Sequence, residues 1–226
     1  MMSPRSGLFV VVEGIDGAGT TTHSKRLVKT LARAGYDARL TCEPSSGPIG
    51  SLIRQVLSHR VIVAGDSGPR GLGWSTMALL FAADRLDHLD SFVLPALADG
   101  ALVVSDRYDL SSLAYQSVTA PPGVEPMGWI RELNVRAARP DLTLVLDVSP
   151  ELAAERRKSR GGAEELFEKA DVQARLAAVY AHAETIVPSD RVVHLSSEGD
   201  ADSVAAAVLE VVTRAATERG IRPSPR

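Results

Sequence analysis

The chain has 226 residues, of which 45% are hydrophobic and 23% are charged, which is typical of a folded globular protein and excludes a disordered one. A net charge of -3 and an aromatic content of 4% argue against a nucleic-acid-binding module, which needs a basic surface and stacking positions. The single cysteine, Cys42, cannot form a disulfide within the chain, and the histidines show no metal-ligand spacing. The apolar run Leu8–Val12 is too short for a signal peptide or a membrane span, so we expect a cytoplasmic protein without a membrane partner.

Strand-like and helix-like segments alternate in the N-terminal part of the chain. A β-branched apolar run predicts a buried strand at Leu8–Val12, and a helix is predicted over Thr21–Ala34 with Gly35 as its stop. A second strand is expected at Ala38–Cys42 and a short helix at Ile49–Leu57. This alternation is typical of a parallel sheet covered by helices.

Two loops and a long helix are predicted for the middle of the chain. Residues 65–73 and 120–128 are rich in glycine or proline and indicate loops, of which the first is expected to be mobile. The long helix is predicted over Ser75–Ala98, and the third strand over Ala101–Val104. Spacings of three and four give this helix an apolar stripe of Leu79, Ala82, Leu86, Leu89, Val93 and Leu97.

The C-terminal part of the chain supplies two more strands, predicted at Leu142–Leu146 and Val192–Leu195. A helix is expected to begin at Pro150, and a closing amphipathic helix covers residues 203–217 before a flexible tail at about 218–226. Five strands with helical crossovers predict an α/β fold of three layers, a five-stranded parallel sheet flanked by helices.

A glycine-rich segment, GIDGAGTTT, lies between the first predicted strand and the first predicted helix. Its glycines allow the backbone to curl so that consecutive N–H groups face phosphate oxygens, and the following helix adds the positive end of its dipole. The hydroxyl of Thr21 stands where a Mg²⁺ ligand is expected. The segment predicts an ATP phosphate site formed by Gly14, Ile15, Asp16, Gly17, Ala18, Gly19, Thr20, Thr21 and Thr22.

The loop departs from the usual pattern G-x-x-x-x-G-K-[ST] at Thr20, which stands in the place of the lysine. That lysine contacts the β- and γ-phosphates, and losing one preorganised donor can lower a rate on the order of a hundredfold or more. Lys25 lies about 7.5 Å further along the predicted helix and is expected to project away from the phosphates. Taken alone, the segment fits a plain strand-to-helix turn as well as a phosphate site.

Four further segments follow the loop in the order and spacing of one enzyme family. They are Glu43-Pro44 with Gly47 and Ile53-Arg54, then LLFAADR (Leu79–Arg85), SDRYDLSSLAYQ (Ser105–Gln116) and RPDLTLVLDVSPELAAERRKSRGG (Arg139–Gly162). With the glycine loop, they resemble the thymidylate kinase family of P-loop nucleoside-monophosphate kinases. The resemblance implies phosphoryl transfer from ATP to dTMP, giving dTDP and ADP for dTTP synthesis, with Mg²⁺ as the cofactor. It also implies a homodimer whose single domain, residues 1–226, carries a small lid at about 155–168.

Asp106 and Arg107 follow a predicted strand, at the sheet edge where open α/β proteins bind ligands. Arg107 can hold an acceptor phosphate by a bidentate contact, and Asp106 can organise Mg²⁺ and its water beside Thr21. The alternative is a helix-capping aspartate followed by a surface arginine.

The resemblance also implies an acceptor site. Phe81 and Arg85 share a helix face and match positions that stack on thymine and bond its carbonyl. Tyr115 matches a ring under the sugar, where it would crowd a 2′-hydroxyl; each of these side chains could also be an ordinary structural residue. Glu43 follows Cys42 where the family usually has arginine, which leaves this loop's phosphate role open. Cys42 itself is expected to be buried at the end of its strand. The implied dTMP-binding residues are Asp16, Glu43, Arg54, Phe81, Arg85, Arg107, Ser111, Ser112, Tyr115 and Gln116.

The lid of the family coincides with a cluster of cations, Arg156, Arg157, Lys158 and Arg160. A lid arginine that many members carry is replaced by Glu165 or Leu166. We hypothesise that Arg156, Arg157 or Arg160 moves onto the β- and γ-phosphates and replaces the two absent cations, although a solvated basic helix face is the alternative. The catalytic residues expected from the sequence are Asp16, Asp106, Arg107, Arg156 and Arg160.

Two other functions are compatible with the sequence. The acceptor could be another nucleoside or deoxynucleoside monophosphate, which a panel of acceptors would reveal. Alternatively, because two cations are absent, the chain could be a catalytically weak homologue that binds nucleotide, for which dTMP binding without turnover would be the sign.

Overall fold

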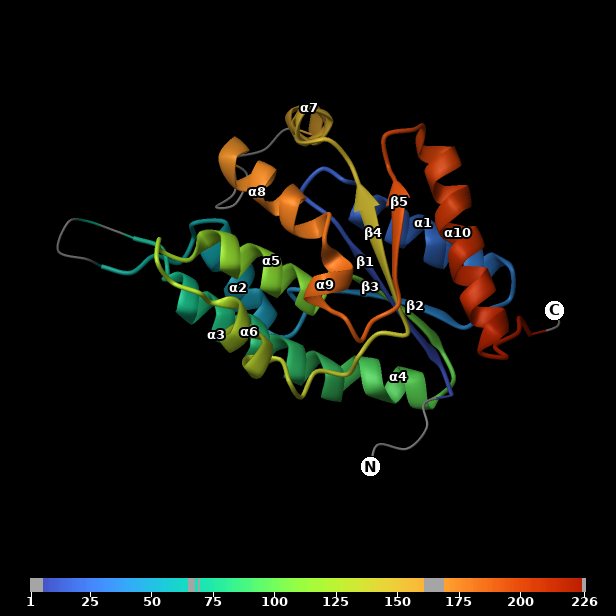
Figure 1. Cartoon of the computed structure of the whole chain (residues 1–226). Coiled ribbons are helices and arrows are strands. Elements are labelled where there is room, and N and C mark those ends of the chain that lie inside the picture. The colour runs from blue at the N-terminus through green and yellow to red at the C-terminus, as the bar shows by residue number, and fades with distance from the viewer. Residues whose placement is uncertain (1–5, 65–67, 69, 161–168, 225–226) are drawn as a thin grey trace.

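The computed structural model describes residues 6–64, 68, 70–160 and 169–224, with Arg160 described in its backbone only. At its centre is a sheet of five parallel strands in the order β2-β3-β1-β4-β5 (Figure 1). This confirms the parallel sheet expected from the sequence. The strands are β1 Leu8–Glu13, β2 Ala38–Cys42, β3 Leu102–Asp106, β4 Leu142–Asp147 and β5 Val192–Ser196.

Helices cover both faces of the sheet, which confirms the three-layer α/β fold (Figure 1). On one face α1 (Thr20–Arg33) packs against α10 (Ala201–Glu218), and on the other α5 (Asp109–Thr119) packs against α8 (Ala170–Tyr180). None of the described helices is long and apolar enough to cross a membrane. The remaining helices are α2 Pro48–Leu57, α3 Trp74–His88, the π-helix η1 Leu89–Val93, α4 Leu94–Ala98, α6 Met127–Leu133, α7 Pro150–Arg160 and α9 Ala183–Ile186.

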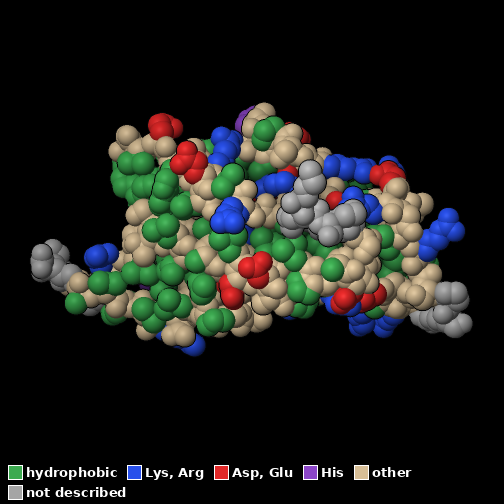
Figure 2. Space-filling view, turned by 90° about the horizontal axis from the view of Figure 1, so that it is seen from below, with side chains coloured by type: hydrophobic (Ala, Val, Ile, Leu, Met, Phe, Trp, Pro, Cys, Tyr) green, Lys and Arg blue, Asp and Glu red, His purple; other side chains and the backbone are tan. Residues whose placement is uncertain are grey.

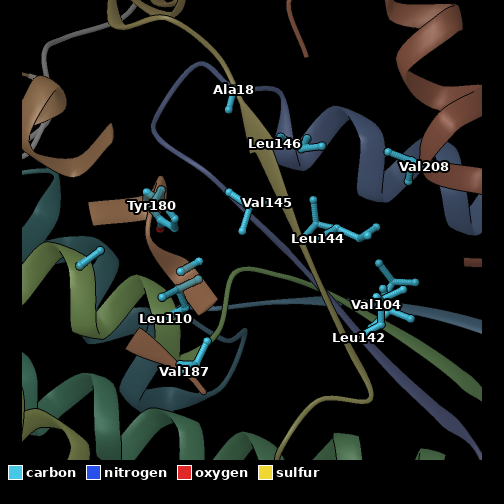
Figure 3. Close-up of a cluster of buried hydrophobic side chains, with 14 of the residues drawn as sticks. Ala18, Val104, Leu110, Leu142, Leu144, Val145, Leu146, Tyr180, Val187 and Val208 are labelled. Carbon is cyan, nitrogen blue, oxygen red and sulfur yellow. The ribbon is translucent and has the colours of Figure 1, made fainter. Parts of the chain in front are cut away.

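The apolar side chains of β4 alternate between the two faces of the sheet (Figure 3). Leu144 points to the side of Val208 on α10, whereas Val145 points to the side of Tyr180 and Leu110. All these side chains are buried. Because both faces of such a strand are covered, its sequence is a continuous apolar run, and this is why the central strands could be predicted.

The register of the sheet brings three strand ends together. Val12 on β1 pairs with Asp106 on β3, and Asp106 pairs with Cys42 on β2. The loops that follow these strands therefore leave the sheet along one edge, and they carry the glycine loop, the Glu43 segment and Arg107.

The prediction of one long α-helix over residues 75–98 needs two corrections. First, Leu79 and Leu86 of the expected buried stripe are 50% and 36% exposed. The buried face of α3 instead includes polar residues, among them Asp84 and Arg85. Second, the helix passes through the π-helical segment η1 just before Pro95, whose nitrogen has no hydrogen to donate.

Other boundaries also differ from those predicted. The loop expected over residues 120–128 ends at Pro126, because Met127 begins α6, and α8 and α9 were not predicted. Residues 65–67 and 69 of the glycine-rich loop, and residues 161–168 of the lid, lie outside the described residues. In the tail, the Ser224 N–H donates to the Gly35 carbonyl at 2.9 Å, so this part of the tail lies against the end of α1.

Candidate active site

A cavity of about 790 Å³ opens where β1, β2 and β3 end. Its lining includes the two residues expected to bind Mg²⁺, Thr21 and Asp106. It also includes every residue that the sequence implied for the acceptor: Asp16, Glu43, Arg54, Phe81, Arg85, Arg107, Ser111, Ser112, Tyr115 and Gln116.

The glycine loop connects β1 to α1 and follows a path that requires glycine. Gly14, Gly17 and Gly19 have φ angles of 152°, 96° and 92°, a region that other residues rarely adopt. Thr20 begins α1, and the N-cap residue of this helix, Gly19, has no side chain that could cap its N-terminus. The first amides of α1, with the positive end of its dipole, are therefore available to an anion such as a phosphate.

Thr21 and Asp106, the two residues expected to bind Mg²⁺, are in direct contact. The Thr21 hydroxyl donates to Asp106 Oδ2 at 2.5 Å, and Asp106 Oδ1 is buried without a hydrogen-bond partner among the described residues. A hydroxyl and a carboxylate are oxygen ligands that suit Mg²⁺. Because the described residues contain no group of three or more His, Cys, Asp or Glu side chains that could hold a metal, the other ligands would be water and phosphate oxygens.

Arg107 joins the glycine loop to the acceptor side of the cavity. Its φ angle is 71°, and it donates to Asp16 Oδ1 at 2.6 Å and to the Gly14 carbonyl at 2.8 Å. Its guanidinium also lies 5.2 Å from the centre of the Tyr115 ring. These contacts hold the positive charge of Arg107 beside the glycine loop.

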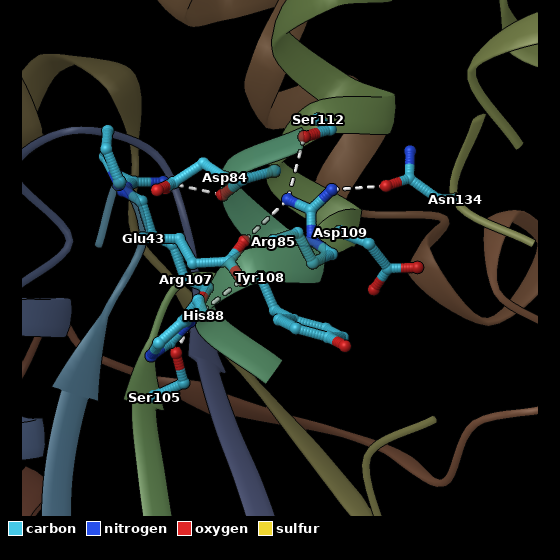
Figure 4. Close-up of polar contacts among 12 residues, drawn as sticks. Glu43, Asp84, Arg85, His88, Ser105, Arg107, Tyr108, Asp109, Ser112 and Asn134 are labelled. Carbon is cyan, nitrogen blue, oxygen red and sulfur yellow. Dashed lines mark hydrogen bonds and ion pairs between the residues drawn. The ribbon is translucent and has the colours of Figure 1, made fainter. Parts of the chain in front are cut away.

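Arg85 sits in a buried polar cluster at the wall of the cavity (Figure 4). Its side chain is 1% exposed and lies 2.7 Å from Glu43, which also contacts His88 at 3.3 Å. It donates to Ser112 at 3.0 Å and to the amide oxygen of Asn134. Arg85 and Ser112 are thus brought together as the sequence implied, while Glu43 balances the charge of Arg85 inside the protein.

The neighbouring segment, which carries Cys42 and Arg54, also lines the cavity, and the dTMP-binding role of Arg54 stays a prediction. Arg54 donates to the Pro44 carbonyl at 2.9 Å and so holds the loop after β2. Cys42 was interpreted as a buried residue, but it is exposed at the end of β2 and lines the cavity. Its neighbour Glu43 is buried and completes the Arg85 cluster.

Comparisons with known proteins agree with this site. The family model described as thymidylate kinase matches residues 12–199. The chain belongs to the thymidylate kinase family. The kinase is 36% identical to a probable thymidylate kinase of Pyrococcus horikoshii over 205 residues, 90% of this chain and 96% of the relative. It is 38% identical to the thymidylate kinase of Ruegeria pomeroyi (92% and 95% covered) and 37% identical to that of Xanthomonas oryzae (94% and 86%).

The resemblance inferred from the motifs is therefore confirmed, and the kinase is a nucleoside-monophosphate kinase, a phosphotransferase. The individual roles of its site residues stay predictions.

Glu13 is a site residue that the motif analysis missed. It ends β1 and is fully buried, and its Oε1 accepts the N–H groups of Tyr108 (2.8 Å) and Ser111 (3.2 Å) at the start of α5. Its Oε2 accepts the hydroxyls of Ser111 (2.6 Å) and Tyr180 (3.0 Å). Burial raises the pKa of Glu13 to about 7, although Arg107 and the hydrogen bonds oppose the rise. The signal in the sequence was an acidic residue that ends an apolar strand directly before the glycine loop.

Gln173 on α8 was also missed. It accepts the Asp16 N–H at 3.2 Å and donates to Asp16 Oδ2 at 3.1 Å, so α8 fixes both the backbone and the side chain of Asp16. Gln173 is fully buried. A polar residue on an unpredicted helix gives no local signal, so only the fold could reveal it.

The arginines of the lid region differ in the contacts that their side chains make. Arg156 donates to the Ser197 carbonyl at 2.8 Å, and Arg157 donates to the Asp16 carbonyl in the glycine loop. The side chain of Arg160 and positions 165 and 166 lie outside the described residues. Lys25, one helical turn after Thr21 on α1, lines the same cavity, and its projection away from the phosphates stays a prediction.

Proposed function

We propose that the kinase transfers the γ-phosphoryl group of ATP to dTMP, giving dTDP and ADP. The observation that supports this proposal is a single cavity. Thr21, Asp106 and Arg107 line it together with Phe81, Arg85 and Gln116. A phosphate-binding end and a base-binding end then belong to one continuous site.

Two unsatisfied polar atoms support thymine as the base. Gln116 Oε1 and Arg85 Nε are buried and have no hydrogen-bond partner among the described residues, and both residues line the cavity. Thymine presents one ring N–H between two carbonyl oxygens. The N–H suits the acceptor on Gln116, and a carbonyl suits the donor on Arg85. Phe81 lines the same cavity and can stack on the base.

The remaining roles follow from charge. Mg²⁺, held through Thr21 and Asp106, would neutralise negative charge on the donor phosphates. Arg107 binds the acceptor phosphate and offsets the repulsion between two anions as they approach. The attacking oxygen is already ionised at neutral pH, so alignment and charge stabilisation suffice and no strong general base is needed. Asp16 keeps Arg107 in position at 2.6 Å.

A panel of acceptors tests the choice of base. With MgATP, ADP release should be fast for dTMP and slower for dUMP, which lacks only a methyl group, and near background for AMP, GMP and CMP.

Gln116→Leu should raise the KM for dTMP about tenfold or more, because it leaves the thymine N–H unpaired. Ser117→Ala, on the same helix but outside the cavity lining, is the matched control and should change KM less than twofold. Equal rates for dTMP and AMP would contradict thymine recognition, and dTMP binding without turnover would favour a catalytically weak homologue.

The kinase is also proposed to form a homodimer in the cytoplasm, where its nucleotide substrates are found. Apolar side chains gather over the part of the surface formed by α3 and α6 (Figure 2). Leu79 and Leu86 on α3 are 50% and 36% exposed, and Val135 after α6 is 79% exposed. A contiguous apolar surface of this kind is typical of a protein interface.

A further inference from the structure

One positive charge is absent from the glycine loop. Thr20 occupies the lysine position, and its neutral side chain is buried with 6% exposure. A triphosphate held only by amides and Mg²⁺ would lack the side-chain cation that normally stabilises negative charge on the γ-phosphoryl group during transfer. Another residue must therefore bring a cation to this loop.

Helix α7 is fixed against the glycine loop by direct backbone contact. A Cβ added to Gly17 would lie 2.4 Å from the carbonyl oxygen of Ala153, so only glycine permits this approach. Ala153 itself is fully buried. The face of α7 that carries Ala153 therefore faces the loop, and Arg157, four residues later, lies on the same face.

We infer that the guanidinium of Arg157 supplies the charge to the donor phosphates that the missing lysine would have supplied. The Nη1 group of Arg157 donates to the carbonyl oxygen of Asp16, inside the glycine loop. A guanidinium has five N–H donors, and this bond uses one of them. The bond to the Asp16 carbonyl thus holds the Arg157 side chain at the loop, and its other N–H groups can donate to phosphate oxygens. This assignment rests on the proposed function of the kinase.

The other described cations near the loop are less suited to this role. Arg107 already bonds Asp16 and the Gly14 carbonyl, and it faces the acceptor. Arg156 donates to the Ser197 carbonyl after β5 rather than to the glycine loop. Lys25 lines the cavity near Thr21, but it is exposed, and no hydrogen bond or ion pair with another described residue holds its side chain. Of the three arginines hypothesised from the sequence, Arg157 is the one whose described side chain contacts the loop.

A double-mutant cycle between positions 20 and 157 tests the inference. Arg157→Ala should lower kcat on the order of a hundredfold, as loss of one preorganised donor does, and should weaken binding of a non-hydrolysable ATP analogue. Thr20→Lys in the same chain should restore most of the lost turnover, because the two cations serve one purpose. Lys158→Ala, an exposed neighbour on α7, is the matched control and should leave both quantities within twofold.

Calorimetry with dTMP and thermal unfolding show whether the variants keep their fold and acceptor site, and both should match the wild type. The inference is overturned if Arg157→Ala keeps turnover and analogue affinity within threefold of wild type. It is also overturned if Arg157→Ala lowers turnover by the same factor in the wild-type chain and in the Thr20→Lys chain. If the wild-type chain releases no ADP in response to dTMP, the proposed function is contradicted instead. Binding of the ATP analogue would then still decide whether Arg157 contacts the donor phosphates.

Discussion

Glu13 is the ionisable side chain that joins the glycine loop to the acceptor helix. Its carboxyl accepts hydrogen bonds from Tyr108, Ser111 and Tyr180, which lie on α5 and α8 or at their ends. Any change in the charge of Glu13 is therefore transmitted to the elements that carry both halves of the site.

We expect Glu13 to make stability depend on pH. Burial raises its pKa from 4.5 to about 7, so the folded state holds a proton that the unfolded state has released. The stabilisation from this group is complete below pH 4.5 and is lost as the pH rises to about 7. Relative to Glu13→Gln, the wild-type free energy of unfolding should therefore fall by up to about 1.4 kcal/mol per pH unit in this window. Urea unfolding of both proteins at pH 5, 6, 7 and 8 measures the difference, and a difference that stays constant refutes the assignment.

The Glu43–Arg85 pair predicts a large loss of stability when one partner is removed. Both side chains are almost fully buried, at 2% and 1% exposure. Glu43→Ala leaves the guanidinium of Arg85 without its counterion and should lower the free energy of unfolding by about 3–5 kcal/mol. Asp202→Ala breaks the exposed pair with Arg26 and should cost less than about 1 kcal/mol. Chemical denaturation compares the two variants, and equal losses would show that burial does not govern the Glu43 pair.

At the scale of elements, the contact between the glycine loop and α7 gives a prediction for ATP binding. Gly17→Ala places a methyl group against the Ala153 carbonyl and strains a φ angle of 96°, so α7 must move away from the loop. The KM for ATP should rise about tenfold or more while dTMP affinity changes little. Gly71→Ala, where nothing lies within 4 Å of the added Cβ, is the matched control. Unchanged ATP kinetics in Gly17→Ala would mean that the docking of α7 is not needed.

The elements that the sequence predicted share a local signal. The central strands β1, β3 and β4 are apolar runs that are buried on both faces, and the glycine loop combines a strand, close glycines and a helix start. Helix α8 lacks such a signal, because Gln173 is buried on its inner face. The stripe on α3 failed for the same reason: periodicity counts apolar residues, whereas Arg85 is buried by its pairing with Glu43, which is distant in the chain. The contacts between side chains across the site could be inferred only through the family resemblance. These residues are far apart in the chain, and local sequence patterns do not predict which of them meet.

At the scale of the whole molecule, the exposed apolar side chains of α3 and α6 predict association. Because Leu79 and Leu86 are 50% and 36% exposed within one chain, a second chain should cover the exposed part of these side chains. Light scattering after size-exclusion chromatography should give twice the mass of one chain. Leu79→Asp should shift the population toward monomer, whereas Lys29→Asp, an exposed substitution on α1, should leave it dimeric. A wild-type chain that stays monomeric at tens of micromolar would rule out the dimer.

The central claim is that one cavity brings MgATP and dTMP together for direct transfer. Its most direct test is a time course of the purified chain with both nucleotides, in which dTDP and ADP are separated and quantified by ion-exchange chromatography. We expect equimolar dTDP and ADP, a strict requirement for a divalent cation, and a large loss of product with Arg107→Ala. If no dTDP forms with any divalent cation or nucleoside triphosphate donor, while dTMP still binds, the account of the site as a phosphoryl-transfer centre is wrong.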